Sequence, residues 1–101
     1  MADLFSPVTV GKWTLDNRIV MAPMTRNRAT PDGVPTDLMA EYYGQRATAG
    51  LIITEGVQPS TVGQGYMNSP GLHTPAQIAA WRTVADAVHQ NGGRIVAQIM
   101  H

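Results

Sequence analysis

The chain has 101 residues, with seven Lys and Arg against seven Asp and Glu, so its formal net charge is zero. Such a balance argues against nucleic acid or an anionic membrane as the main partner, and the length allows one small core. The absence of cysteine excludes disulfides, thiolate metal sites and a cysteine nucleophile. No apolar run approaches the roughly 18 residues of a membrane span, and the first residues lack the parts of a signal peptide. We therefore expect a cytoplasmic protein with no membrane partner.

Residues 1–18 predict a small antiparallel hairpin. Val8–Val10 and Trp13–Leu15 are β-prone runs separated by Gly11-Lys12, a plausible two-residue turn. Residues 19–22 follow as four apolar positions, which predict a parallel strand buried on both faces.

Pro23 closes that strand, because proline cannot donate to a ladder. Thr25 then lies just past the carboxyl end of the strand, where ligands bind in open α/β sheets and in α/β barrels. A turn residue that bonds its own backbone is the alternative interpretation of Thr25.

The first helix is expected over residues 37–49, capped by Thr36 and followed by Gly50. The residues expected on its inner stripe are Leu38, Met39, Tyr42, Arg46 and Ala49. A second buried strand is predicted over 51–54 and ends at Glu55-Gly56, followed by a long loop over 57–73.

The second helix has the clearest start. Thr74, Pro75 and Gln77 form a T-x-x-Q capping box with proline at the first helical position, and Asn91-Gly92-Gly93 ends the helix. Residues 94–100 predict a third strand.

The order is a hairpin and then strand, helix, strand, helix, strand, which is typical of a parallel sheet with right-handed crossovers. A doubly wound sheet and a (β/α)8 barrel both fit. The first strand–helix turn holds no G-x-G-x-x-G or P-loop motif, which weakens the nucleotide-binding version of the doubly wound sheet. A buried strand at the last residues, with nothing to cover it, leads us to expect an incomplete domain.

Polar or small residues lie at the ends of the three predicted strands, namely Thr25, Glu55-Gly56 and Gln98. Gln98 shares strand parity with Val96 and Met100, so these three face away from Ile95, Ala97 and Ile99. A strand-end amide can satisfy another amide edge, such as that of a uracil- or isoalloxazine-type ring; a glutamine bonded to neighbouring backbone is the alternative.

Glu55 is a candidate base, although an acidic strand end more often pairs with an arginine of the next unit. Tyr66, in the long loop, is interpreted either as a pocket wall or as a packed loop tyrosine. No His, Asp or Glu cluster has metal-ligand spacing.

Four segments, collinear over nearly the whole chain, closely resemble the old yellow enzyme family of flavin-dependent ene-reductases. They are Ala22–Ala29, Ile52–Gly56, Gly65-Tyr66 with Pro70–His73, and Val96–His101. The resemblance implies the N-terminal part of a (β/α)8 TIM barrel, incomplete without the remaining strands. It also implies an FMN cofactor, NAD(P)H as reductant and an activated alkene as small-molecule substrate.

Residue by residue, the resemblance implies flavin contacts at five positions and substrate contacts at two. Thr25 is similar to a threonine that tunes the flavin, and Gln98 to a glutamine that reads the pyrimidine edge. The remaining flavin positions are Pro23, Met24 and Gly56, and the substrate positions are Tyr66 and Met100. Met100 departs from well-known members that carry tryptophan there. The family's substrate-holding pair and proton donor come from later strands, so no catalytic residue is expected in this chain.

The expected organisation is a hairpin over 1–18 that caps the barrel bottom and a first β-α-β-α-β segment over 19–101. An enzyme completed by further strands, from a complementary polypeptide or from additional sequence, is the main hypothesis. The alternatives are a non-catalytic fragment of a split or rearranged barrel and an independent small flavin-binding module.

Overall fold

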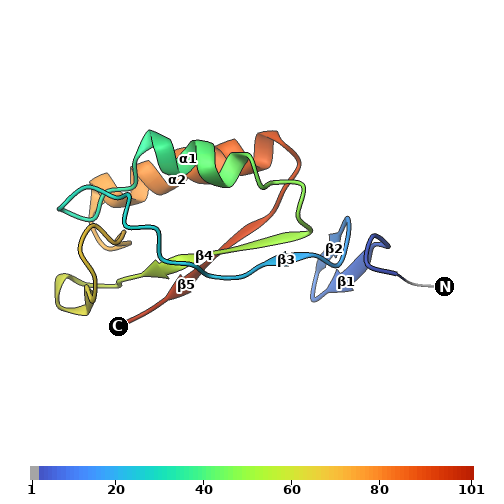
Figure 1. Ribbon diagram of the computed structural model, residues 1–101, viewed down its shortest axis with the longest axis horizontal. Coiled ribbons are helices and arrows are strands. Elements are labelled where there is room, and N and C mark those ends of the chain that lie inside the picture. The colour runs from blue at the N-terminus through green and yellow to red at the C-terminus, as the bar shows by residue number, and fades with distance from the viewer. Residues whose placement is uncertain (1–2) are drawn as a thin grey trace.

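The computed structural model describes residues 3–101 and shows a two-layer molecule, with a parallel sheet beneath a pair of helices (Figure 1). In chain order the elements are β1 (Val8–Val10), β2 (Trp13–Leu15), β3 (Val20–Met21), α1 (Asp37–Gly44), β4 (Leu51–Val57), the short 3-10 helix η1 (Thr61–Gly63), α2 (Pro75–Gln90) and β5 (Ile95–Ile99). The predicted alternation of strands and helices is therefore confirmed.

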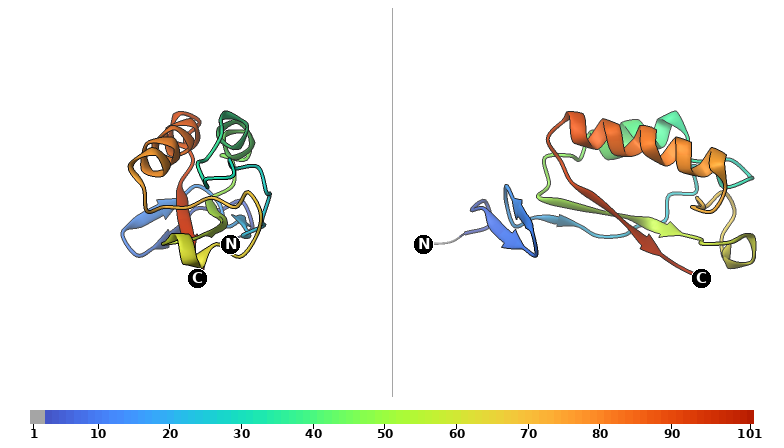
Figure 2. Two further views of the ribbon diagram at one scale, coloured as in Figure 1. Left: turned by 90° about the vertical axis from the view of Figure 1, so that its left-hand side faces the viewer. Right: turned by 180° about the vertical axis from the view of Figure 1, so that it is seen from behind.

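The three later strands form one sheet in the order β3-β4-β5, with both neighbouring pairs parallel. Helices α1 and α2 lie side by side over one face of this sheet (Figure 2). The predicted hairpin is confirmed, since β1 and β2 pair antiparallel from Val8 opposite Leu15 to Val10 opposite Trp13. It projects from the end of the sheet where the strands begin (Figure 1).

The core lies between the helices and the sheet. Its members, Met39, Tyr43, Ile52, Val84 and Val88, are all essentially inaccessible. Burial of such side chains stabilises the fold by roughly 1.5–3 kcal/mol each. The core therefore joins both helices to β4.

The prediction that the first strand is buried on both faces is wrong for the described residues. Val20 on β3 is 48% exposed, while its neighbour Met21 packs against the helix-side core. The two side chains point to opposite faces of the sheet, and the helices cover only one of those faces.

Helix α1 is shorter than expected and has a different inner face. It ends at Gly44 because the chain turns back to start β4. Its buried residues include Met39 and Tyr43, whereas Leu38, expected inside, is 55% exposed. Thr36 occupies the N-cap but its hydroxyl donates to the carbonyl of Arg28 at 2.9 Å instead of capping the helix.

Gly50 is not the residue that ends α1. A Cβ atom at this position would lie 2.2 Å from the carbonyl oxygen of Asn17, and the Gly50 N–H donates to the Asn17 side-chain oxygen at 2.8 Å. Glycine is required here because the chain entering β4 passes against the chain entering β3.

Helix α2 begins as predicted. The Thr74 hydroxyl accepts the Gln77 N–H at 3.2 Å, and the Gln77 side chain accepts the Thr74 N–H at 3.1 Å. Pro75 takes the first turn and Asn91 the C-cap, followed by Gly92 with a φ of 79°.

Strand β4 continues to Val57, so the expected end at Glu55-Gly56 is wrong. The pairing with β5 absorbs an extra residue there and then resumes. The following loop is also more ordered than expected, because it contains η1 and closes at its base through a parallel bridge between Gln58 and Gly71.

Candidate functional site

The carboxyl ends of β4 and β5 bring together two of the predicted site residues. Gly56 is the register partner of Gln98. Ile95, three residues earlier, packs against the helix-side core, and because side chains alternate along a strand, Gln98 lies on the opposite, exposed face. This confirms the face predicted from strand parity. The Gln98 side chain makes no hydrogen bond within residues 3–101, so the backbone-bonded alternative has no partner in the described part of the chain.

Met100 lies directly against Gly56. A Cβ atom on Gly56 would sit 2.6 Å from Cε and 3.0 Å from Sδ of Met100. The Met100 N–H also donates to the Val57 carbonyl at 3.0 Å, extending the ladder one residue past β5. Because Gly56 has no side chain, the thioether of Met100 can occupy this space.

Strand β4 carries a bulge just before Gly56. Ile53 pairs with Val96 and Gly56 pairs with Gln98, so between these two pairs β4 contains one residue more than β5. The Thr54 hydroxyl accepts the Gln98 N–H at 3.2 Å and donates to the Glu55 carbonyl at 2.7 Å. A side-chain oxygen thus replaces the backbone acceptor that the bulge removes.

Glu55 is 1% exposed and pairs with Tyr43 of α1. The Tyr43 hydroxyl donates to Glu55 Oε2 at 2.6 Å and accepts the Glu55 N–H at 3.0 Å. The expected arginine partner is therefore wrong, because Glu55 points into the helix–sheet interface, whereas the guanidinium groups of Arg26 and Arg46 lie over the Tyr42 ring.

Burial raises the pKa of the Glu55 carboxyl above its ordinary value, against the opposing effects of the Tyr43 hydroxyl and of Arg26. Burial, together with the hydrogen bond to Glu55, also raises the pKa of the Tyr43 hydroxyl well above its usual range. Sequence reasoning missed Tyr43 altogether. The sequence offered only a tyrosine on the predicted helix, and the inward-facing position was assigned to Tyr42 instead of the next residue, Tyr43.

Thr25 lies on the exposed chain that follows β3, and its side chain makes no hydrogen bond to the described residues. Glu55 Oε1 accepts the N–H of the next residue, Arg26, at 3.5 Å. The Thr25 segment is thus linked to β4. Pro23 is half-buried, and Met24 is 45% exposed.

Tyr66 lies on the loop between β4 and α2 and is 58% exposed. Its carbonyl accepts from the Ser69 hydroxyl at 2.9 Å and from the Gln64 amide at 3.1 Å, while its ring stays outside the packed part of the loop. The packed-tyrosine interpretation is wrong, and its role as a substrate wall stays a prediction.

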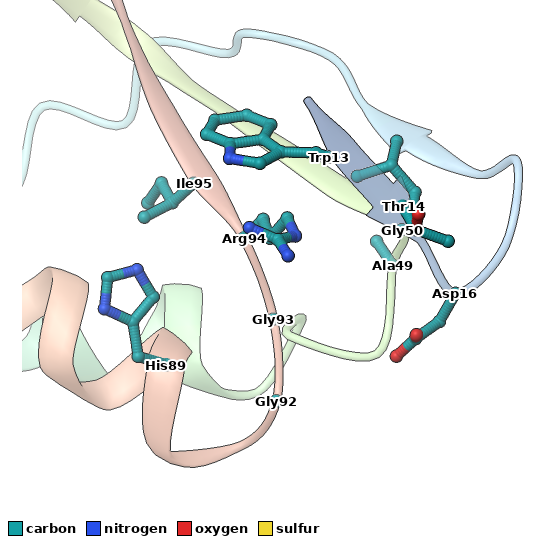
Figure 3. Close-up of a pocket in the computed structure, with 11 residues that line it drawn as sticks. Trp13, Thr14, Asp16, Ala49, Gly50, His89, Gly92, Gly93, Arg94 and Ile95 are labelled. Atoms are coloured by element: carbon teal, nitrogen blue, oxygen red, sulfur yellow. The ribbon is translucent and has the colours of Figure 1, made fainter. Parts of the chain in front are cut away.

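A cavity of about 300 Å³ opens at the other end of the sheet, between the hairpin and the start of β5 (Figure 3). Trp13 and Arg94 line it, with the guanidinium carbon 5.1 Å from the indole centroid. Parallel α/β sheets bind ligands at the carboxyl ends of their strands, and none of the predicted site residues lines this cavity. We therefore place the candidate site at the carboxyl edge.

Within residues 3–101, no group of three His, Cys, Asp or Glu side chains is arranged to hold a metal. No helix in this part of the chain is both long and apolar enough to cross a bilayer.

A family model described as the NADH:flavin oxidoreductase / NADH oxidase family matches residues 3–101. The chain belongs to this family, that of the old yellow enzymes. The old yellow enzyme homologue from Zymomonas mobilis is 52% identical with a TM-score of 0.96, and the match covers 99% of this chain and 28% of that one. Morphinone reductase in complex with tetrahydroNAD is 50% identical with a TM-score of 0.96, covering 100% and 28%.

Among curated old yellow enzyme relatives, a chanoclavine-I aldehyde reductase from Penicillium roqueforti is 50% identical over 101 residues, covering 98% of this chain and 27% of that protein. The chain thus spans just over a quarter of the relatives it matches. Its fold is the N-terminal part of a (β/α)8 barrel, as expected: a hairpin, three strands and two helices.

Proposed function

We propose that the protein is an FMN-dependent NAD(P)H oxidoreductase that reduces activated C=C bonds of α,β-unsaturated carbonyl or nitro compounds, with this chain supplying part of the flavin site. The observation that carries the proposal is the pairing of Gly56 with Gln98 at the carboxyl edge, with the Gln98 amide exposed. When bound, FMN would supply the hydride-transfer chemistry between the nicotinamide and the alkene, and this chain's residues would hold and orient it.

The described residues fit such a cofactor. The Thr25 hydroxyl and the Gln98 amide are exposed polar groups at the same edge, whereas no buried side-chain polar atom of the described residues lacks a partner. Both groups are therefore available to a ligand at that edge, and no buried polar side chain has to be disrupted for them to bind it. There, Thr25 would donate to a ring carbonyl, Gln98 would pair with the pyrimidine edge, and the backbone at Pro23 and Met24 would lie against the ring.

Met100 and Tyr66 would line the substrate side. A thioether is flexible and polarisable and adapts to irregular shapes, so the pocket wall at Met100 adjusts to its occupant. The relatives named as reductases of an aldehyde and of morphinone support a carbonyl-conjugated substrate.

We further propose that the site is completed by the remaining barrel strands, from additional sequence or a complementary polypeptide. Strands β3 and β5 are the edges of the described sheet, and one face carries the exposed Val20. Unpaired apolar edges are aggregation sites unless covered, which argues against an independent small flavin module. A cytoplasmic location remains an expectation from the sequence.

The first experiment is a visible spectrum of the purified protein, followed by NAD(P)H oxidation with and without an activated alkene. We expect a flavin band and alkene-dependent oxidation. A flavin band without alkene-dependent turnover would favour a binder, and the absence of flavin would favour the non-catalytic fragment. Mass spectrometry under denaturing conditions would show whether a second polypeptide accompanies the chain.

A further inference from the structure

We propose that the bulge in β4 at Thr54 and Glu55 is a shared positioning element for Thr25 and Gln98, the two side chains proposed to meet the flavin. This inference rests on the proposed function and adds two positioning residues to it. One bulge residue holds the backbone of Gln98, and the other holds the backbone beside Thr25.

The connection to Gln98 runs through the Thr54 hydroxyl. In regular parallel pairing, the Gln98 N–H would donate to a carbonyl of β4; here it donates to Thr54 Oγ1 at 3.2 Å. Because that hydroxyl is itself oriented by its bond to the Glu55 carbonyl at 2.7 Å, it offers its lone pair in one direction. The bond fixes the amide plane before Gln98 and so aims its side chain.

The connection to Thr25 runs through the Glu55 carboxylate. The Arg26 N–H, which Glu55 Oε1 accepts at 3.5 Å, belongs to the same peptide unit as the Thr25 carbonyl. An anchor on that peptide plane restricts the ψ angle of Thr25, and with it the direction in which the Thr25 hydroxyl points.

The carboxylate is itself held in place. Tyr43 donates to Oε2 at 2.6 Å and accepts the Glu55 N–H at 3.0 Å, which joins side chain and backbone of the same residue to α1. A buried carboxyl destabilises an apolar interface unless it is bonded, and an apolar residue would pack there without that penalty. The raised pKa of Glu55 reflects the same penalty. A positioning task accounts for its presence.

The test uses two variants that remove a hydroxyl and keep the side-chain shape, Thr54→Val and Tyr43→Phe, in the flavin-loaded protein that contains this chain. Thr54→Ser is the conservative rescue. Val88→Ala, which removes buried methyl groups on α2, is the control for general destabilisation. The readouts are the FMN dissociation constant, the flavin reduction potential and the thermal unfolding temperature.

We expect Thr54→Val to raise the FMN dissociation constant by roughly three- to tenfold, the effect of one misplaced hydrogen bond, with Thr54→Ser close to the unmodified protein. Tyr43→Phe should lower the flavin reduction potential, as Thr25→Ala should, but by a smaller amount. Val88→Ala should lower only the unfolding temperature.

The inference is overturned if Thr54→Val and Tyr43→Phe lower the unfolding temperature but leave the dissociation constant and potential unchanged. It is also overturned if Val88→Ala changes them as much. If Thr54→Val does not fold, Tyr43→Phe alone decides by the same criteria. A protein that holds no FMN before any substitution refutes the proposed function, which is a different result from a flavoprotein indifferent to the bulge.

Discussion

The terminal methyl of Met100 occupies the space that a side chain at Gly56 would need, 2.6 Å from the position of its Cβ atom. The two residues lie on neighbouring strands, with Gly56 in register with Gln98. Since methionine has three rotatable bonds, a larger residue at position 56 would displace the thioether before it moved the backbone. The shape of the proposed substrate wall therefore depends on a glycine.

Gly56→Ala should destabilise the protein by about 1 kcal/mol, because packing Met100 against an added methyl introduces strain. In a Met100→Ala background the same change should become neutral or stabilising by roughly 0.4–1 kcal/mol, since alanine reduces the entropy of the unfolded chain. A double-mutant cycle on the free energy of unfolding measures the coupling. Simple additivity of the two changes would contradict the contact.

Thr25→Ala should leave FMN bound but lower its reduction potential. The variant removes one neutral hydrogen bond, worth roughly 0.5–1.5 kcal/mol, which is enough to shift a potential without releasing the cofactor. The reduction of the flavin by NAD(P)H should therefore slow, while the reduction of the alkene should not. Spectroscopic titration measures the reduction potential, and an unchanged potential would mean that Thr25 makes no hydrogen bond to the flavin ring.

Gln98→Leu should weaken FMN retention more than Thr25→Ala does. It leaves several polar atoms of the ring edge without partners, and such groups are expensive to desolvate unpaired. The FMN dissociation constant is the measurement. Gln45→Leu, an exposed change in the turn that follows α1, is the control, and equal effects at both positions would count against the proposed role.

Glu55 should make stability fall as the pH rises. Burial raises the pKa of the folded carboxyl above its ordinary value of 4.5, so the folded state keeps a proton that the unfolded chain has released. This stabilisation is complete below that pH and is lost as the pH rises through the raised pKa.

Urea titrations from about pH 4 to pH 8 should therefore show the protein losing stability relative to Glu55→Gln as the pH rises. Glu41→Gln, at an exposed position on α1, is the matched control and should show no such trend. A constant difference between the unmodified protein and Glu55→Gln across this range would mean that folding does not shift the pKa of Glu55.

Gln77→Ala should destabilise the protein by about 2–4 kcal/mol. The Gln77 side chain accepts the N–H groups of His73 and Thr74 at 2.9 and 3.1 Å and donates to the Asp32 carbonyl at 3.0 Å. Without the Gln77 side chain, these three backbone groups lose their hydrogen-bond partner, and the free-energy cost of desolvating them is no longer offset. Gln45→Ala on the surface should change stability by less than about 0.5 kcal/mol, and similar losses at both positions would contradict the prediction.

The parts of the fold that were predictable are those whose determinants are adjacent in the chain. The start of α2 needs only Thr74, Pro75 and Gln77, three residues within one turn. The face of Gln98 follows from the two-residue period of a strand once one buried neighbour is known. Family resemblance added the proposed flavin contacts, which no local pattern specifies.

The parts that were missed depend on residues far apart in the sequence. Helix α1 ends at Gly44, and Gly50, expected to follow its end, instead contacts Asn17, 33 residues away. At the β4 bulge a threonine hydroxyl accepts the Gln98 N–H across 44 residues. The partner of Glu55 requires knowledge of which α1 face turns inward. Propensity and periodicity carry no information on such pairings.

The loop between β4 and α2 is closed at its base and open at its tip. The Gln58–Gly71 bridge and the bond from the Gln58 amide to the Ser69 carbonyl at 2.9 Å seal the stem, whereas Val62 and Met67 are 85% and 80% exposed. Val62 and Met67 can therefore be substituted without removing a core contact, whereas Asn68 is tied to the chain after β3 because its carbonyl accepts the Ala29 N–H at 3.1 Å. Under the proposed function, substrate preference could change through substitutions at the loop tip alone. A graft of the loop between relatives, with its ends between Gln58 and Ser69, should transfer substrate selectivity while the recipient keeps its own cofactor chemistry.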